Sequence, residues 1–251
     1  MTIKQWMYSL FTAGLLASSV AGADPAFTAC LPALQQRALA AGVTPATVNA
    51  VLANTNYVAR VIELDRRQPE FSETFHNYLT ARVTEQRVQQ GRQMLARHRP
   101  LLEKLQQQYG VPPQYLMAFW GLETNYGSYL GKMPVLDSLA TLACDQRRSE
   151  FFTLELIDAL KMVDANIVTP ALFVGSWAGA VGNMQFMPSA YRAHAVDGDG
   201  DGRADLWRSI PDALTSAANY LNSMGWKKET RWGREVLLPA QFDYNFTSLA
   251  E

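Results

Sequence analysis

The stretch Trp-Gly-Leu-Glu-Thr-Asn-Tyr-Gly, residues 120–127, lies at the end of an expected helix and carries the candidate acid of this chain. Pro112 and Pro113 precede it and suit a helix start, because a proline in the first turn gives up only an N–H that has no partner there. Gly127 suits the left-handed residue that follows a helix end. The sequence therefore predicts a helix between Pro113 and Gly127.

One face of this helix is apolar except at its last position. The positions i, i+3, i+4 and i+7 hold, in order, Leu116, Phe119, Trp120 and Glu123. A carboxyl group beside apolar side chains is partly desolvated, which raises its pKa. Such a group stays protonated near neutral pH and is able to donate a proton in catalysis. Glu123 is therefore a candidate general acid, and the alternative is a glutamate near a helix end that reaches solvent.

Length and charge limit the class of protein. The 251 residues suffice for one large domain or two small ones. A hydrophobic content of 48%, a charged content of 18% and a net charge of −1 are typical of a soluble globular protein. The basic excess with which duplex-binding proteins contact phosphate is missing, so nucleic acid is not an expected partner.

Residues 1–23 have the pattern of a signal peptide. Lys4 is followed by the mostly apolar run 6–16, and the small residues 21–23 suit a cleavage site before Asp24. The run is too short to span a bilayer, and no later segment has about 18 consecutive apolar residues. We expect an exported periplasmic protein without a transmembrane segment after signal removal; an uncleaved anchor is the alternative.

The two cysteines, Cys30 and Cys144, are compatible with one disulfide in an oxidising compartment. The sequence leaves open whether they meet. Cys30 as a lipid-attachment site is less favoured, because residues 27–29 lack the usual leucine-led motif.

The remainder of the chain has helical periodicity and no internal repeat. Thr44 is placed to cap a helix that has Pro45 in its first turn, and Ser72 to cap another after a break at Pro69. Further helices are expected over 84–108, with a break or kink at Pro100, and over 138–143 and 149–163. In the last of these, Phe151, Leu154, Ile157, Asp158 and Leu160 are expected near one apolar face.

Two segments suggest ligand contacts. Arg147 and Arg148 form a guanidinium pair suited to an anionic ligand, and the alternative is a solvated helix start. The glycine-rich segment 176–189 combines the amides of Asn183 and Gln185 with aromatic side chains, which is typical of sugar recognition. A tight packing turn explains this segment equally well.

The acidic run 197–203 has the spacing of the first half of an EF-hand loop. Asp197, Asp199 and Asp201 occupy positions 1, 3 and 5, and the carbonyl of Arg203 occupies position 7. Position 12 is Arg208 instead of glutamate, so a late ligand must come from Asp205 or Asp212. Hard oxygen donors favour Ca²⁺ over zinc, and a glycine-rich surface loop is the alternative.

Taken together, these motifs closely resemble the lytic murein transglycosylase B family. The matching segments are 120–127, 138–148, 176–189 and 197–213, supported by 65–71 and by Asn219 to Trp226. The resemblance implies a mainly α fold with a lysozyme-like catalytic core, an EF-hand-like calcium loop and an N-terminal helical region. We accordingly expect the N-terminal region at 24–108, the core at 109–226 with its loop at 197–212, and a short tail at 227–251.

The resemblance also implies an activity. It is cleavage of the β-1,4 bond between N-acetylmuramic acid and N-acetylglucosamine in peptidoglycan, with Glu123 as the single acid/base and a 1,6-anhydro product. It implies further that Ser176, Gln185, Phe186 and Tyr220 line the glycan groove and that Arg147 and Arg148 meet carboxylates of the substrate. The implied metal ligands are Asp197, Asp199, Asp201, Arg203 and Asp212.

Family members usually continue past the position of Glu251 with a segment that completes the groove, so the chain is expected to be truncated relative to them. Two other functions compete with the leading one. A hydrolytic muramidase would need a second carboxylate, for which Asp137 and Asp145 are candidates. A non-catalytic peptidoglycan-binding remnant is the third possibility.

Overall fold

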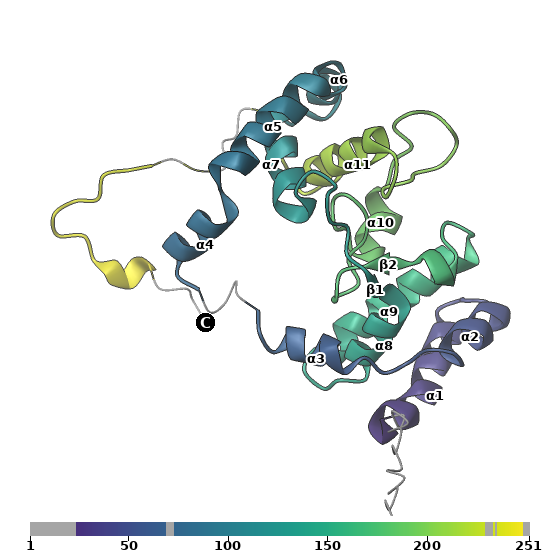
Figure 1. The fold of residues 1–251 in the computed structure, drawn as a ribbon. Coiled ribbons are helices and arrows are strands. Elements are labelled where there is room, and N and C mark those ends of the chain that lie inside the picture. Colours follow the sequence, from purple (N-terminus) through teal and green to yellow (C-terminus); the bar gives the residue numbers. More distant parts are fainter. Residues whose placement is uncertain (1–23, 69–72, 229–232, 234, 248–251) are drawn as a thin grey trace, which may run out of the picture.

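The protein is described by a computed structural model over residues 24–68, 73–228, 233 and 235–247, and this part is mainly helical, as expected. Figure 1 shows the arrangement of the elements. The α-helices are α1 (Pro25–Ala40), α2 (Pro45–Leu52), α3 (Ala59–Asp65), α4 (Phe75–Arg82), α5 (Glu85–Arg97), α6 (Arg99–Tyr109), α7 (Pro113–Thr124), α8 (Val135–Ala143), α9 (Ser149–Asp164), α10 (Pro188–His194) and α11 (Ile210–Ser223). Short 3₁₀ turns are η2 (Pro170–Leu172) and η3 (Tyr244–Thr247). Strands β1 (Met133–Pro134) and β2 (Val174–Gly175) pair antiparallel, with Met133 opposite Gly175.

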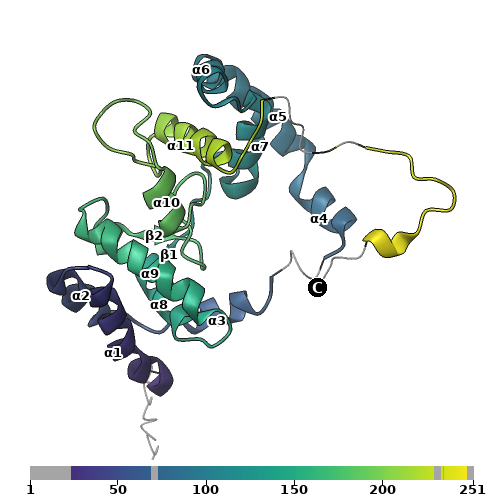
Figure 2. The same cartoon turned by 180° about the vertical axis from the view of Figure 1, so that it is seen from behind.

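The helices form two packed groups that α10 and α11 connect. In one group α1, α2 and α3 pack on the pair α8 and α9; in the other α5, α6, α7 and α11 pack together. Helix α10 contacts both α9 and α11. The two views of the ribbon agree on this arrangement, with α4 set apart from both groups (Figures 1 and 2). Residues 120–127, at the end of α7, therefore lie in the second group, whereas Arg147 and Arg148, between α8 and α9, lie in the first.

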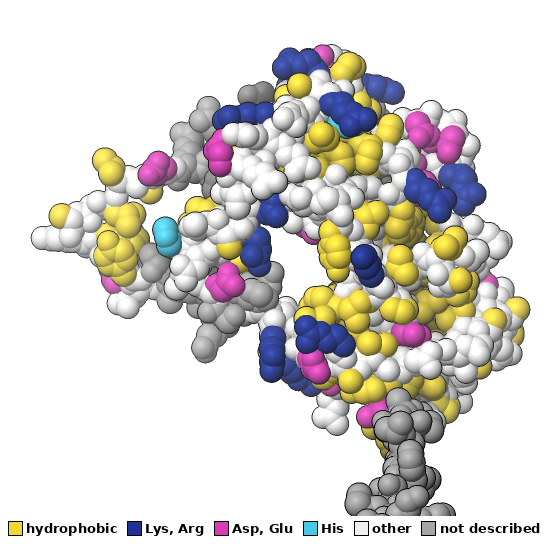
Figure 3. Space-filling model, viewed as in Figure 1, with side chains coloured by type: hydrophobic (Ala, Val, Ile, Leu, Met, Phe, Trp, Pro, Cys, Tyr) yellow, Lys and Arg dark blue, Asp and Glu magenta, His cyan; other side chains and the backbone are white. Residues whose placement is uncertain are grey.

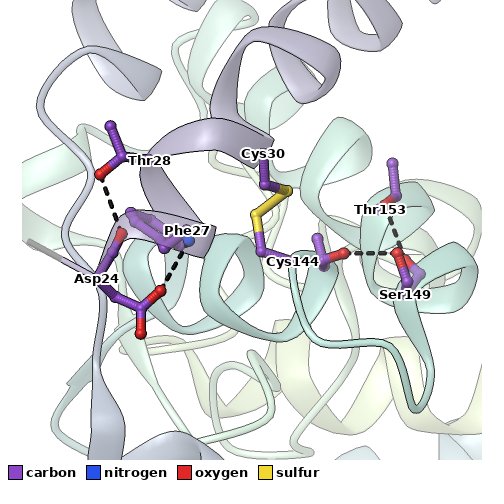
Figure 4. The surroundings of a disulfide bond; sticks show 8 residues. Asp24, Phe27, Thr28, Cys30, Cys144, Ser149 and Thr153 are labelled. Atoms are coloured by element: carbon purple, nitrogen blue, oxygen red, sulfur yellow. Dashed lines mark hydrogen bonds between the residues drawn. A yellow bond between two sulfur atoms is a disulfide. The ribbon is translucent and has the colours of Figure 1, made fainter.

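A disulfide fastens the N-terminal helix to the core. Cys30 of α1 and Cys144 after α8 are bonded across 114 positions of sequence, which answers the question that the sequence left open (Figure 4). Asp24 caps α1 by accepting a hydrogen bond from the Phe27 N–H at 2.9 Å. Arg37 adds a two-pronged ion pair with Glu150 at 2.6 and 2.7 Å. Helix α1 is thus held to the pair α8 and α9.

Several expected helix ends are confirmed and others are wrong. Thr44 caps α2 with Pro45 in the first turn, as predicted. The break predicted near Pro100 in the segment 84–108 is confirmed: α5 and α6 meet at His98, and Pro100 lies in the first turn of α6. Thr74 caps α4, whereas the predicted cap Ser72 lies outside the described residues.

The predicted apolar face of helix 149–163 is partly wrong. Phe151 and Leu154 are 46% and 51% exposed, while Phe152 and Leu156 are buried. Helix α9 packs against α8 on one side and against α10, α1 and α2 on others. Its buried face is therefore set by several neighbours, and a single i, i+3 stripe does not describe it.

The molecular surface is hollowed between the two helical groups. Figure 3 shows this hollow, with hydrophobic side chains along its walls and Lys and Arg side chains beside it. Within the described residues, no helix is long and apolar enough to cross a membrane.

Candidate active site

Helix α7 ends in an unusual turn just after Glu123. Asn125, Tyr126 and Gly127 have φ angles of 49°, 58° and 79°, so three successive residues are left-handed. The left-handed cap is Asn125, and the prediction that Gly127 serves as this cap is wrong. Asparagine tolerates this conformation better than most residues, and its side-chain amide donates to the Ser128 hydroxyl at 3.0 Å. The turn reverses the chain within three residues of the candidate acid.

The Glu123 side chain is open to solvent on one side and crowded by protein on the other. Leu116 and Trp120 of the predicted stripe are buried, whereas Glu123 lies at its exposed edge. Burial by the surrounding protein nevertheless raises the pKa of the Glu123 carboxyl. Within the described part of the chain no hydrogen bond or ion pair to this carboxyl occurs. The direction of the pKa shift agrees with the prediction, and the group is free to meet a ligand.

The residues on either side of Glu123 are fixed by Asn183. The Trp120 indole N–H donates to the Asn183 Oδ1 at 3.0 Å, and the Thr124 hydroxyl donates to the Asn183 backbone carbonyl at 2.8 Å. Asn183 is only 2% exposed. The expectation that its amide contacts sugar is therefore wrong, because its polar atoms are all used inside the protein.

The segment 176–189 is folded by hydrogen bonds within the protein. The Ser176 N–H donates to the Ala180 carbonyl at 2.8 Å and the Ala180 N–H donates to the Ser176 hydroxyl at 3.0 Å, and these two bonds close a turn. Gln185 has a left-handed φ of 47°, and its amide N–H donates to the carbonyls of Leu130 and Gly182. These internal hydrogen bonds agree with the packing turn that the sequence offered as one alternative.

The aromatic residues expected at the groove form one cluster. Tyr220 lies 5.3 Å from Phe186 and 6.5 Å from Phe119, between ring centroids. Phe186 is only 3% exposed, so it supports the wall instead of lining it. Tyr220, on α11, is half-buried and lies beside Phe186. The cluster therefore joins α7 and α11 through the segment 176–189.

Arg147 and Arg148 are held by a buried aspartate that sequence reasoning missed. The carboxylate of Asp65, 2% exposed, accepts from Arg147 at 2.8 Å and makes an ion pair with Arg148. Burial opposes the ionisation of Asp65, but the bonds and charges of Arg148 and Arg147 outweigh it and lower its pKa. The two guanidinium groups remain 44% and 37% exposed. The sequence signals here were the break before Pro69 and the family resemblance of segment 65–71, and neither gave any indication of the ion pair.

The acidic loop brings together three of its predicted ligands. Oxygen atoms of Asp197, Asp199 and Asp212 lie within 4.8 Å of one another. Asp212 is completely buried at the start of α11 and accepts from the N–H groups of Gly198 and Asp199. Its second oxygen accepts from the Asp205 N–H at 2.7 Å. Hard oxygen donors at this separation fit a calcium ion.

The carboxylates of Asp201 and Asp205 do not join this cluster. Asp201 accepts from the Arg203 N–H at 2.8 Å. Asp205 accepts from the N–H groups of Trp207 and Arg208, each at 3.0 Å, and so caps the turn that leaves the loop. Of the two candidates for the late carboxylate, Asp212 rather than Asp205 therefore faces the cluster.

Comparison with known proteins links these motifs to one family. The family model of the transglycosylase SLT domain matches residues 26–251. The membrane-bound lytic murein transglycosylase B of Escherichia coli (strain K12) is 42% identical over 147 residues, which are 58% of this chain and 40% of that protein.

Solved structures share the fold. SltB3 from Pseudomonas aeruginosa, in complex with NAG-anhNAM-pentapeptide, superposes with a TM-score of 0.79 at 42% identity, over 88% of this chain and 59% of the other. The Escherichia coli lytic transglycosylase Slt35, in complex with calcium, gives a TM-score of 0.70 at 32% identity, over 84% and 67%. The chain thus spans well under two thirds of the first two relatives.

Proposed function

The chain belongs to the transglycosylase SLT domain family, and we propose that it cleaves peptidoglycan glycan strands as a lytic transglycosylase. Its substrate bond is the β-1,4 linkage from N-acetylmuramic acid to N-acetylglucosamine. The relative SltB3 binds a NAG-anhNAM-pentapeptide, which has the anhydro end that this reaction leaves.

The observation that carries the proposal is the state of Glu123. Its carboxyl has a raised pKa, and no partner among the described side chains competes for it. It ends the helix whose sequence matches the family at its most specific motif. A lone carboxyl of this kind suits a reaction in which one group acts first as acid and then as base.

In the proposed reaction Glu123 first donates its carboxyl proton and then regains one. Glu123 donates it to the glycosidic oxygen as the bond from C1 of the muramic acid to that oxygen breaks. Glu123 then accepts a proton from the 6-hydroxyl of the same sugar, whose oxygen forms a bond to C1. The products are a free 4-hydroxyl on the departing sugar and a 1,6-anhydro ring, so no water is consumed and the enzyme is restored.

A hydrolytic muramidase is less well supported, because its second carboxylate has no candidate in a suitable state. Asp145 makes an ion pair with Arg66 at 2.8 Å. Burial raises the pKa of Asp137, although the Asn56 amide counters this, and a general base must be ionised. Both residues contact the N-terminal helical region.

The same sites suggest how substrate is held. We propose that Tyr220 and Gln185 contact the sugars, with Ser176 and Phe186 shaping the wall behind them. Arg147 and Arg148 would meet the lactyl or peptide carboxylates with the exposed parts of their guanidinium groups. Asp65 leaves those parts free, since it occupies only one side of each arginine.

We further propose a structural calcium ion at the acidic loop, with Asp197, Asp199 and Asp212 as ligands and with Asp201 and the Arg203 carbonyl joining on binding. The ion would neutralise carboxylates that otherwise repel one another. Slt35, of the same fold, binds calcium. We propose the periplasm as the site of action, because its substrate class lies there; the expected signal peptide lies outside the described residues.

Digestion of purified peptidoglycan tests the function. Mass spectrometry of the products should reveal anhydro ends, which lack one water relative to reducing ends. Glu123→Gln, which keeps the shape of the side chain, should release neither. Reducing ends alone from the unaltered protein would favour the muramidase. Binding without release, unchanged by Glu123→Gln, would favour the non-catalytic remnant.

A further inference from the structure

Asn183 is a junction between two parts of the fold that are distant in sequence. Its Oδ1 accepts from Trp120 and its backbone carbonyl accepts from Thr124, one position beyond Glu123. Its side-chain amide donates to the carbonyls of Leu206 and Trp207 at 3.0 and 3.1 Å. Its own backbone N–H also donates to Leu206, at 2.8 Å. A single buried residue thus holds the catalytic helix end and the segment that leaves the acidic loop.

Two glycines make room for this junction. A Cβ on Gly127 would lie 2.6 Å from the Asn183 Oδ1, and a Cβ on Gly182 would lie 2.7 Å from the Leu206 carbonyl oxygen. Both glycines also have positive φ angles. The glycines at 127 and 182 therefore allow the backbone to approach the Asn183 side chain and the Leu206 carbonyl closely.

The segment that leaves the acidic loop, residues 205–208, is fixed by several hydrogen bonds besides those from Asn183. Asp205 caps the N–H groups of Trp207 and Arg208, and its own N–H donates to Asp212. Asp212 in turn accepts from Gly198 and Asp199 at the start of the loop. The carboxylates of Asp212 and Asp205, the backbone of residues 206–208 and the Asn183 amide therefore link the start of the acidic loop to Trp120 on the helix of Glu123.

We propose that Asn183 is a positioning residue that couples the conformation of the acidic-loop exit to the placement of the Glu123 carboxyl. This rests on the proposed function of Glu123. Trp120 and Thr124 bracket Glu123 on its helix, so their fixation sets both the direction of the carboxyl and how much water reaches it. When residues 206–208 are less firmly held, Asn183 is displaced, and Trp120 and Thr124 move with it.

A double-mutant cycle of Asn183→Leu and Asp205→Ala tests the coupling. Asn183→Leu keeps the branched shape of the side chain and removes its hydrogen bonds to Trp120, Leu206 and Trp207, while the backbone bonds of residue 183 to Thr124 and Leu206 remain. Asp205→Ala loosens the 206–208 turn without touching α7. Hydrogen exchange in residues 120–127 and the kcat for release of anhydro ends are the two readouts. Each single variant should speed the exchange and lower kcat, by about ten- to a hundredfold for Asn183→Leu, with little change of KM.

The double variant should be no worse than Asn183→Leu alone, because Asp205 acts through Asn183. The pH profile of kcat/KM should shift toward lower pH in Asn183→Leu, since a loosened turn hydrates Glu123 and returns its pKa toward its ordinary value. Asn183→Asp, which retains the acceptor for Trp120 but lacks the donors to Leu206 and Trp207, should reproduce the faster exchange and the lower kcat, and it guards against a failure of the leucine variant to fold.

Thr153→Val is the matched control, because it also removes a buried hydrogen bond, from the Thr153 hydroxyl to the Ser149 carbonyl, far from this path. It should leave exchange in 120–127 and the pH profile unchanged. Additive effects in the double variant, or an unshifted pH profile, would overturn the coupling. If the unaltered protein releases no anhydro ends while the exchange cycle is non-additive, the proposed function fails and the junction stands.

Discussion

At the scale of single residues, the chemistry of this protein depends on how each carboxylate is partnered. Among the residues that the structure describes, Glu123 has no hydrogen-bond or ion-pair partner and its pKa is raised, whereas Asp65 is enclosed by arginines and its pKa is lowered. Asp212 is buried like Asp65, but backbone N–H groups surround it. The same functional group is thus a candidate acid at Glu123, a structural anion at Asp65 and a hydrogen-bond acceptor that organises the loop at Asp212, because its neighbours differ.

The raised pKa of Glu123 gives a prediction for activity and stability. Activity should fall as pH rises through this pKa, since the first step needs the protonated acid. The folded state favours protonated Glu123, so its contribution to stability is greatest below the ordinary pKa of glutamate and is lost as pH rises through the raised value.

Glu123→Gln should therefore lower the rate about 10²- to 10⁴-fold while leaving the protein at least as stable as the unaltered chain at neutral pH. Urea unfolding at pH 7 and at acidic pH measures the second effect. A glutamine variant that is markedly less stable at pH 7 would show that the carboxylate is favourably partnered.

The ion pairs of Asp65 give a second prediction. Asp65→Asn should destabilise the fold by about 1–3 kcal/mol, less than a fully buried pair because the two arginines are partly exposed. Since the folded pKa is lowered, this contribution is present above the ordinary pKa of aspartate and is lost as pH falls through the lowered value. Denaturant unfolding at pH 7 and pH 3 should show the difference shrinking at the lower pH.

Glu63→Gln is the control for this measurement, because it breaks only the exposed pair with Arg60. Its effect should stay within about 0.5 kcal/mol. Equal losses in both variants would mean that burial of Asp65 adds nothing.

At the scale of elements, the end of α7 is shaped by the packing of Tyr126. Its ring enters between α5 and α7, and its hydroxyl donates to the Arg87 carbonyl at 3.1 Å. Gly91 of α5 and Gly121 of α7 are the residues against which it packs. The helix therefore carries a glycine two positions before Glu123, at a helix-propensity cost of about 1 kcal/mol, because any larger residue would push the turn away.

Gly121→Ala should consequently destabilise the protein, although glycine-to-alanine changes usually favour a helix. The new Cβ would lie 2.6 Å from the Tyr126 hydroxyl and 2.7 Å from its ring carbon Cζ. We expect a loss of about 1–3 kcal/mol, measured by thermal or urea unfolding. The exposed Ala118 on the same helix provides the comparison, since Ala118→Gly should cost about 1 kcal/mol through propensity alone. A gain of stability in Gly121→Ala would contradict this packing.

The disulfide fixes the position of α1 relative to α8. Replacing both Cys30 and Cys144 by serine should lower stability by about 2–4 kcal/mol, because the bond closes a long loop and restricts the unfolded chain. Reductant should lower the melting temperature of the unaltered protein to about that of the double variant, and it should leave the melting temperature of the double variant unchanged. A double variant that melts at the same temperature as the parent would show that the other contacts of α1 suffice.

At the scale of the whole molecule, the acidic loop lies at the entrance to α11, which packs on both α7 and α6. Organisation of this loop therefore affects the group of helices that carries Glu123. The carboxylates of Asp197 and Asp199 are open to solvent, so an ion from solution has access to them.

Calcium removal gives a prediction at this scale. A chelator should lower the melting temperature and added calcium should restore it, with a gain of about 2.7 kcal/mol at a hundredfold excess over Kd. Asp199→Asn should abolish this shift while altering the metal-free protein little, because Asp199 is exposed. Glu63→Gln, outside the loop, should retain the shift. Identical melting with and without chelator would exclude an occupied site.

The sequence by itself determined the local features of this protein. Periodicity, caps and prolines were sufficient to predict most helices, the position of Glu123 at the end of α7 and the spacing of the acidic loop, because these depend on residues a few positions apart. The mainly α fold and the family followed from motifs of the same short range.

The tertiary structure decided the partners. The pairing of Cys30 with Cys144, the capture of Arg147 and Arg148 by Asp65, and the burial of Asn183 beneath Trp120 all join residues more than 60 positions apart. Helical periodicity carries no information about such distances, since it places a side chain on a face without specifying what covers that face. The sequence suggested that the Asn183 amide contacts sugar. Only the packing of the helices revealed that it instead supports the helix that carries Glu123.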